Sequence, residues 1–356
     1  MTLVIRVDPD RPDRDSIARA AGCLRRGGLV AFPTETVYGL GAHALDPVAV
    51  QRLFEAKGRP ANDPLIVHVS TFDQIAALTR SVPAEARALA DRFWPGPLTL
   101  VLERSERVPN EVTAGLDTVA VRIPSHPVAR ALLAAADLPV AAPSANLFSR
   151  PSPTRAAHVL EDLDGRIDIV LDGGTTDVGV ESTVLDLAHG TPTVLRPGAV
   201  TLDQLRTVIP TVVLRSPEAA DGRTAMASPG LLARHYSPRA PLTLYEGRAE
   251  PALEALAADA RTAMAAGSRV GILAPREELE AIRSMMDRPD PPPHVEDLGA
   301  RHDLAEIAQR LYAALRAFDS AGVDLIFART VSAEEGLGAA IRDRLRRAAA
   351  GRIVTS

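Results

Sequence analysis

The sequence has 356 residues, of which 46% are hydrophobic and 24% are charged, and its formal net charge is −5. This composition is typical of a globular protein, and it lacks the overall basic balance expected of a chain held mainly by nucleic-acid backbone. The length favours two domains, each with its own core. One cysteine, Cys23, excludes an internal disulfide framework and fits a reducing compartment.

The first residues, MTLVIRVDPDRPDRD, reach acidic side chains too early for a signal peptide, and no apolar run approaches the length of a membrane span. We therefore expect a soluble cytoplasmic protein with no membrane partner.

The chain from Leu29 to about Leu195 mixes apolar strand-like runs with helical patterns. The runs are LVAFPTETVYGL, PLIVHV, LTLVLE, TVAVRI, LPVAAP, DIVLDGG, STVLDL and PTVLRPG, and the predicted helices cover 15–26, 47–56, 84–93, 127–136 and 154–163. Because strands and helices do not alternate strictly, the pattern predicts a mixed twisted sheet with helices.

Three segments follow from these patterns. Residues 1–215 form the first domain, and residues 216–241, rich in Pro, Gly and Ser, are predicted to link it to the second. In residues 242–356, apolar strands alternate regularly with helices of ten or more residues, which predicts a small parallel, Rossmann-like α/β domain.

The loop KGRPANDP raises two interpretations. Asp46 and Pro47 predict a helix start and Gly58 predicts its end, so Lys57 could complement the helix dipole while Arg59 is solvated. The other interpretation is a ligand-binding loop. His68, in the following strand-like run, is more often a hydrogen-bonded packing residue than a catalyst.

Polar residues also interrupt the apolar run FPTETVYGLGAH, where buried hydroxyls and a carboxylate need partners, in a ligand or in a tight turn network. The segment GLGAHA satisfies G-x-G-x-x-A but does not open the next helix, as a dinucleotide site requires. No H-x-x-x-H pair occurs and one cysteine cannot build a zinc site, so no metal site is expected from protein side chains. No G-x-S-x-G elbow occurs, so a serine hydrolase is not expected. No Walker motif is present either.

Several motifs in order resemble the L-threonylcarbamoyladenylate synthases with the YrdC-like fold. They span 33–42, 57–68, 93–100, 119–124, 143–146, 182–186 and 195–199. The resemblance covers roughly residues 10–210, and SPGLLARHYSP with the α/β tail is similar to the long, two-domain form. It implies an open α/β sheet around a concave, positively lined cavity.

The resemblance implies an enzyme that joins L-threonine, bicarbonate or CO₂, and ATP into threonylcarbamoyl-AMP with release of pyrophosphate. Mg²⁺ would accompany ATP. The product would pass to a tRNA threonylcarbamoyltransferase complex, which modifies the adenosine beside the anticodon in tRNAs reading codons that begin with A. Weak RNA binding is a further expectation.

The family's motifs carry over residue by residue. The residues that would contact ATP are Lys57, Arg59, Asp63, Thr118, Ser144, Asn146, Ser152, Arg196 and Arg234. Of these, Lys57 and Arg59 would stabilise the developing charge. Threonine would contact Thr36, His68, Arg122, Ala142 and Ser182, with Arg122 holding its carboxylate. His235 and Tyr236 would belong to a lid over the cavity. No residue is assigned as general base.

Two departures stand out. Phe148-Ser149 replaces the Ser-Gly that often follows SANL, so no contact is carried over there. Asp63 stands where some members have Asn, and an extra anion near phosphate is unfavourable. Two other functions stay open: a carbamoyltransferase that forms a carbamoyl adenylate, and a module of this fold that binds double-stranded RNA or ribosomes.

Overall fold

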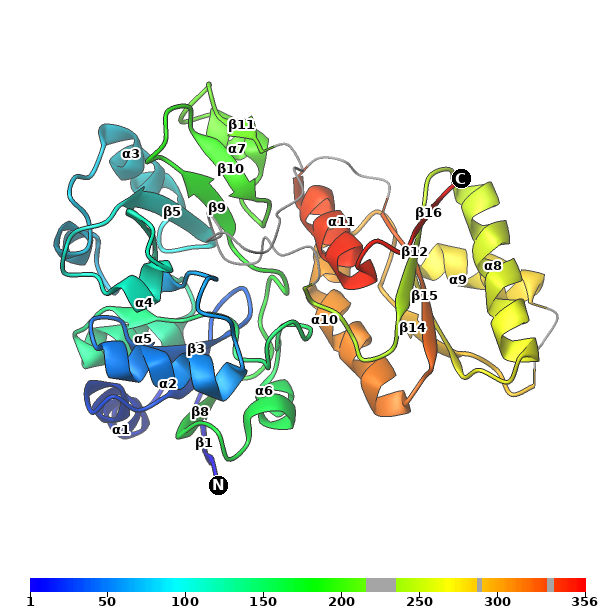
Figure 1. The fold of residues 1–356 in the computed structure, drawn as a ribbon, viewed down its shortest axis with the longest axis horizontal. Helices are drawn as coiled ribbons and strands as arrows, with labels where there is room; N and C mark the ends of the chain where they lie inside the picture. The colour runs from blue at the N-terminus through cyan, green and yellow to red at the C-terminus, as the bar shows by residue number, and fades with distance from the viewer. Residues whose placement is uncertain (216–234, 287–289, 332–335) are drawn as a thin grey trace. The chain divides into compact units, whose positions relative to one another are not determined.

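The computed structural model describes residues 1–215, 235–286, 290–331 and 336–356. The chain divides into two compact units (Figure 1). Of the described residues, unit 1 holds 1–148 and 152–215, and unit 2 holds 149–151 and 235–356. The boundaries expected at 215/216 and 241/242 stay predictions, because residues 216–234 lie outside the described part of the chain.

Unit 1 is built on one mixed sheet of eleven strands in the order β1-β8-β2-β3-β7-β4-β6-β5-β9-β10-β11. Neighbours such as β4 and β6 run parallel, whereas β2 and β3 run antiparallel, which confirms the mixed sheet expected from the sequence. The strands are β1 (Leu3–Arg6), β2 (Val30–Pro33), β3 (Tyr38–His43), β4 (Ile66–His68), β5 (Leu98–Glu103), β6 (Thr118–Arg122), β7 (Val140–Ala141), β8 (Ile169–Asp172), β9 (Thr183–Asp186), β10 (Thr193–Arg196) and β11 (Val213–Leu214).

The helices of unit 1 bury apolar side chains against both faces of this sheet. They are α1 (Arg14–Arg25), α2 (Pro47–Lys57), the 3₁₀ helix η1 (Phe72–Ala77), α3 (Ala84–Phe93), α4 (Asn110–Thr113), α5 (Pro127–Ala136), α6 (Ala156–Leu163) and α7 (Leu202–Arg206). Successive residues of β2 belong to different cores: Val30 and Phe32 belong to the cluster that contains residues of α1 and α5, whereas Ala31 belongs to the cluster that contains residues of α2, α3 and α6. The alternation of a strand therefore divides the interior into two layers.

Helix α2 begins and ends where its sequence signals predict. The Asp46 side chain accepts a hydrogen bond from the N–H of Val48, Pro47 occupies the first turn, and Gly58 ends the helix with a positive φ of 60°. The loop after Gly58 leads into β4, and Val67 of this strand packs in the main core with its flanking residues Leu65 and Val69. This order of elements places Lys57 and Arg59 just before a fully buried strand.

The glycines of GLGAHA lie inside strand β3, so the motif opens no helix. A Cβ at Gly41 would lie 2.9 Å from both Phe32 Cε1 and Val140 Cγ1. Glycine is needed at this position because the neighbouring side chains occupy the space that a methyl group would take.

Unit 2 contains a parallel sheet of five strands in the order β14-β13-β15-β12-β16, which confirms the expected parallel α/β fold. Helices α8 and α9 cover one face, and α10 and α11 cover the other (Figure 1). The elements are β12 (Leu242–Glu246), α8 (Ala249–Ala265), β13 (Val270–Ala274), α9 (Arg276–Met285), β14 (His294–Asp297), α10 (Leu304–Ala321), β15 (Leu325–Arg329), α11 (Gly336–Ala349) and β16 (Ile353–Thr355). Across the described ranges of both units, no helix is long and apolar enough to cross a bilayer.

Candidate functional site

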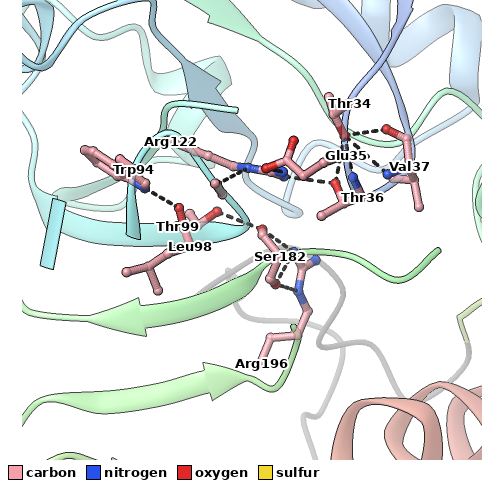
Figure 2. A network of polar contacts seen from close by, with 11 residues as sticks. Thr34, Glu35, Thr36, Val37, Trp94, Leu98, Thr99, Arg122, Ser182 and Arg196 are labelled. Atoms are coloured by element: carbon pink, nitrogen blue, oxygen red, sulfur yellow. Dashed lines mark hydrogen bonds and ion pairs between the residues drawn. The ribbon is translucent and has the colours of Figure 1, made fainter. Parts of the chain in front are cut away.

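The polar residues between β2 and β3 form a turn network and also reach beyond it. Thr34 Oγ1 donates to the carbonyl of Val37 at 2.7 Å and accepts from the backbone N–H groups of Thr36 and Val37 at 3.2 Å. From the sequence, we expect these polar groups to find partners in a ligand or in a tight turn network. Thr34 closes the turn, while Glu35 and Thr36 point to another strand (Figure 2).

Arg122, the last residue of β6, receives both of these side chains. Its Nη2 lies 2.8 Å from Glu35 Oε1, its Nη1 donates to Thr36 Oγ1 at 3.1 Å, and its Nε donates to the carbonyl of Gly96 at 3.2 Å (Figure 2). The Arg122 and Glu35 side chains are only 4% and 7% exposed. The site thus contains a buried ion pair, and the expected contact of Arg122 with a ligand carboxylate stays a prediction.

His68, the last residue of β4, lies beside Arg122 in the parallel register of β4 and β6. Burial, and next the charge of Arg122, lower the pKa of His68 to about 3. The imidazole is therefore neutral at pH 7, and its Nδ1 has no hydrogen-bond partner among the described residues. Ala142 lies against the same strand, because its N–H donates to the carbonyl of Ile66 at 2.9 Å.

Ser182 is brought to the same region by the segment before β9. The N–H groups of Val178 and Gly179 donate to the carbonyls of Glu35 and Thr36 at 2.8 and 3.1 Å. Ser182 Oγ lies 2.8 Å from Thr99 Oγ1 and accepts from Arg196 Nη2 at 3.2 Å (Figure 2). The five residues expected to bind threonine therefore gather at neighbouring strand ends, although their contact with threonine stays a prediction.

Lys57 is buried and holds the loop that contains Ser144 and Asn146. Its Nζ donates to the backbone carbonyls of both residues, at 2.6 and 2.5 Å. Its backbone carbonyl accepts from the N–H of Phe148 at 2.9 Å. Lys57 therefore does more than complement a helix dipole: it fixes the loop from which two expected ATP contacts come.

Arg59 is also buried, so the interpretation of Arg59 as a solvated side chain is wrong. Its Nη2 lies 3.0 Å from Asp63 Oδ2 and donates to the carbonyl of Pro64 at 2.8 Å. The pair neutralises Asp63, which removes the difficulty of an extra anion near phosphate. Thr118 is the first residue of β6, whose Ala120 pairs with Ile66 of the strand that follows the loop of Arg59.

The remaining expected residues fall into two groups. Ser152 Oγ donates to Glu181 Oε1 at 2.5 Å, next to Ser182. In unit 2, the N–H of His235 donates to the carbonyl of Arg347 at 3.4 Å, and Tyr236 is buried against Tyr312 with a ring distance of 5.4 Å. Arg234 lies outside the described residues.

Sequence reasoning left three polar residues of this region without a role: Glu35, Thr99 and Glu181. A signal was present for each, because each is a polar side chain next to or within an apolar strand-like run. The sequence did not show which partner each one meets, since those partners come from distant segments.

The carboxylates near the site already have partners: Glu35 with Arg122, Asp63 with Arg59, and Glu181 with Ser152. Within the ranges that the structure describes, no group of three or more His, Cys, Asp or Glu side chains could hold a metal ion.

Comparisons with known proteins cover both units. Residues 22–198 match the family described as "Telomere recombination", and residues 200–350 match "Threonylcarbamoyl-AMP synthase, C-terminal domain". The threonylcarbamoyl-AMP synthase of Pyrococcus abyssi is 44% identical over 99% of both chains, and that of Bacillus subtilis is 44% identical over 95% of this chain and 94% of its own. The crystal structure of P. abyssi Sua5 complexed with L-threonine matches with a TM-score of 0.91, at 44% identity and over 100% of both chains. The chain belongs to the threonylcarbamoyl-AMP synthase family.

Proposed function

We propose that the chain joins L-threonine, bicarbonate or CO₂, and ATP into threonylcarbamoyl-AMP and pyrophosphate. The observation that carries this proposal is the likeness over the whole chain to Sua5 of P. abyssi, which was crystallised with L-threonine. The relatives named threonylcarbamoyl-AMP synthase support it, because the similarity includes both units.

Threonine would bind at the strand ends that carry Arg122, His68 and Ser182. The guanidinium suits the carboxylate, and the neutral imidazole suits the side-chain hydroxyl, which needs a partner but carries no charge. A site that hydrogen-bonds a hydroxyl strongly rejects an analogue that lacks it. Valine should therefore fail as a substrate, although it differs little from threonine in size.

ATP would bind with Mg²⁺ along the loop fixed by Lys57 and the buried Arg59–Asp63 pair. Ser144, Asn146 and Ser152 lie on this loop or just after it, and Arg196 approaches from β10. Lys57 and Arg196 are cations from different elements, whereas Arg59, paired with Asp63, supplies donors without net charge. A polyphosphate bound without a Walker loop needs cations from several elements. We further propose that the product passes to a tRNA threonylcarbamoyltransferase complex.

Pyrophosphate release from ATP, with threonine and bicarbonate each omitted in turn, tests the proposal. We expect release only when both are present, and a threonylcarbamoyl-AMP product by mass spectrometry. Release that does not depend on either substrate would contradict the synthase assignment. A salt-dependent gel shift with double-stranded RNA tests the weaker expectation of RNA binding.

A further inference from the structure

The buried ion pair of Arg122 and Glu35 sets a charge condition on any ligand of this site. The pair is neutral as a whole, because one guanidinium faces one carboxylate at 2.8 Å. A ligand that brought only a carboxylate to Arg122 would leave one uncompensated negative charge in a buried region, which is strongly unfavourable. A zwitterion avoids this cost, provided that its ammonium also meets an anion.

Glu35 is the anion in position to meet that ammonium. Its Oε1 pairs with Arg122, while its Oε2 is buried without a hydrogen-bond partner among the described residues. Two further carboxylates lie in this part of unit 1: Glu181 accepts from Ser152, and Asp177 acts with Glu35 on the pKa of His126. Of these three carboxylates, Glu35 is the one that pairs with Arg122. His68 is neutral, and burial lowers the pKa of His126, the histidine that caps α5 and feels the charge of Glu35.

We propose that Glu35 binds the ammonium group of threonine and accepts its proton. This inference rests on the proposed function and assigns the general base that the sequence did not reveal. Arg122 then holds the ligand carboxylate while Glu35 holds the ammonium. Each charge of the zwitterion thus meets the opposite charge of the Arg122–Glu35 ion pair. Thr36, bonded to Arg122 Nη1, fixes the guanidinium between the two anions.

The chemical step balances with the substrates of the proposed function. The Glu35 carboxylate takes one proton from the ammonium, which gives a neutral carboxylic acid and a free amine. The nitrogen lone pair forms a bond to the carbon of bicarbonate, a C–O bond breaks, and water leaves, so that a carbamate anion is formed. Glu35 afterwards releases its proton to solvent, and a carbamate oxygen is free to attack the α-phosphorus of ATP with pyrophosphate as the leaving group.

The test compares L-threonine with 3-hydroxybutanoate, which has the same carboxylate and hydroxyl but no ammonium. In the full-length wild type, calorimetry should show that threonine binds about 10- to 100-fold more tightly, as a charge-assisted contact predicts. In Glu35→Gln this preference should shrink to within about three-fold, because a neutral amide cannot compensate the ammonium charge.

A matched control is available in unit 2. Glu278 is also a buried glutamate paired with arginines, with Oε2 at 3.3 Å from Arg329 Nε and Oε1 in contact with Arg301. Glu278→Gln makes the same chemical change and should leave the ligand preference at its wild-type value. An unchanged preference in Glu35→Gln would overturn the proposal and leave the ion pair with a packing role alone.

Turnover gives the second readout. At saturating threonine, pyrophosphate release by Glu35→Gln should fall by about 100-fold or more, the range of a general base, while ATP binding is retained. Full turnover by this variant would overturn the proton-acceptor role. If Glu35→Gln does not fold, calorimetry of the wild type with the two ligands is the test. Equal affinity for threonine and 3-hydroxybutanoate overturns the proposal, and a preference for threonine of ten-fold or more supports it. Failure of the proposed function is distinguishable, because it would remove threonine-dependent pyrophosphate release from the wild type itself.

Discussion

Lys57, Arg59 and Arg122 are buried cations of unit 1 that differ in where their acceptors come from. Lys57 donates to two backbone carbonyls, Arg59 pairs with a carboxylate four residues away, and Arg122 pairs with a carboxylate from a distant turn. Because a buried charge is costly unless it is paired, each contact fixes the segment that supplies its acceptor.

The Arg59–Asp63 pair should matter for stability because its side chains are only 4% and 0% exposed. Arg59→Ala leaves Asp63 buried without its cation, and we expect a loss of about 3–5 kcal/mol in the free energy of unfolding, measured by urea denaturation. Arg87 and Asp91 form a pair with the same spacing, but these side chains are 57% and 66% exposed. Asp91→Ala, which leaves the stacking of Arg87 on Phe72 in place, should cost less than about 1 kcal/mol. Equal losses in the two variants would show that burial does not set the value of the pair.

The lowered pKa of His68 predicts a pH dependence of stability. The unfolded chain takes up a proton near pH 6.5, whereas folded His68, with a pKa of about 3, does not. The unfolded state therefore binds more protons between these values, so stability falls as the pH falls from 6.5 towards 3, by at most about 1.4 kcal/mol per pH unit. Urea denaturation between pH 6.5 and 5 should show a shallower slope for His68→Gln than for wild type, and identical slopes would contradict the assignment. Burial lowers the pKa of His126 too, but that contribution is common to both proteins.

At the scale of elements, close packing of β3 against its neighbours makes a prediction about Gly41. An added Cβ would lie 2.9 Å from two side chains of other strands, so Gly41→Ala should destabilise the protein by about 1–3 kcal/mol in thermal or urea unfolding. Gly22 is the control, because it lies inside helix α1 and its Cβ would meet only the ends of two arginine side chains. Gly22→Ala should stabilise by about 0.5–1 kcal/mol. A destabilising Gly22→Ala together with a neutral Gly41→Ala would reverse the argument.

Long elements with local signals were predictable from the sequence. Helices α3 and α5 have the bounds expected, since their apolar spacing and their flanking prolines act locally. Strands β1, β11 and β16 were not predicted. They are short, they have exposed residues, and they exist because a distant strand pairs with them, as Leu3 does with Ile169.

The candidate site likewise contains residues that the sequence indicated and partners that it did not. The expected site residues of the loop after α2 and of the strand ends came from the resemblance to a family, which rests on contiguous motifs, and their contacts with ligands stay predictions. Their partners within the chain could not be named from the sequence: Arg122 and Thr36 are 86 residues apart, and Lys57 bonds carbonyls whose identity no side-chain pattern reveals. Glu35 was visible as a polar interruption, but its role depends on a pairing that only the folded sheet creates.

At the scale of the whole molecule, the chain passes from unit 1 into unit 2 at Ser149 and returns at Ser152. Each of the three intervening residues makes a hydrogen bond or an ion pair within unit 2. The Ser149 carbonyl accepts from the N–H of Ser237 at 2.8 Å, Arg150 pairs with Asp319 at 2.5 Å, and the Pro151 carbonyl accepts from Arg316 at 2.6 Å. The loop that carries Asn146 and Ser152 is thus continuous with a segment that belongs to the other unit.

This continuity predicts that loosening the segment inside unit 2 weakens the use of ATP more than the binding of threonine. Asp319→Asn removes the charge that holds Arg150 but keeps an oxygen for the backbone N–H of Arg239, which Asp319 Oδ1 accepts at 2.7 Å. Partial loss of a charge-assisted contact frees the loop ends, so the KM for ATP should rise about 3- to 10-fold. The affinity for threonine should change less than about two-fold, because Arg122, His68 and Ser182 lie on strand ends of unit 1. Asp324→Asn, in an exposed pair with Arg269 of the same unit, is the control and should change neither constant. Steady-state pyrophosphate release and calorimetry with threonine measure the two quantities. An Asp319→Asn enzyme with the wild-type KM for ATP would show that the segment serves unit 2 alone.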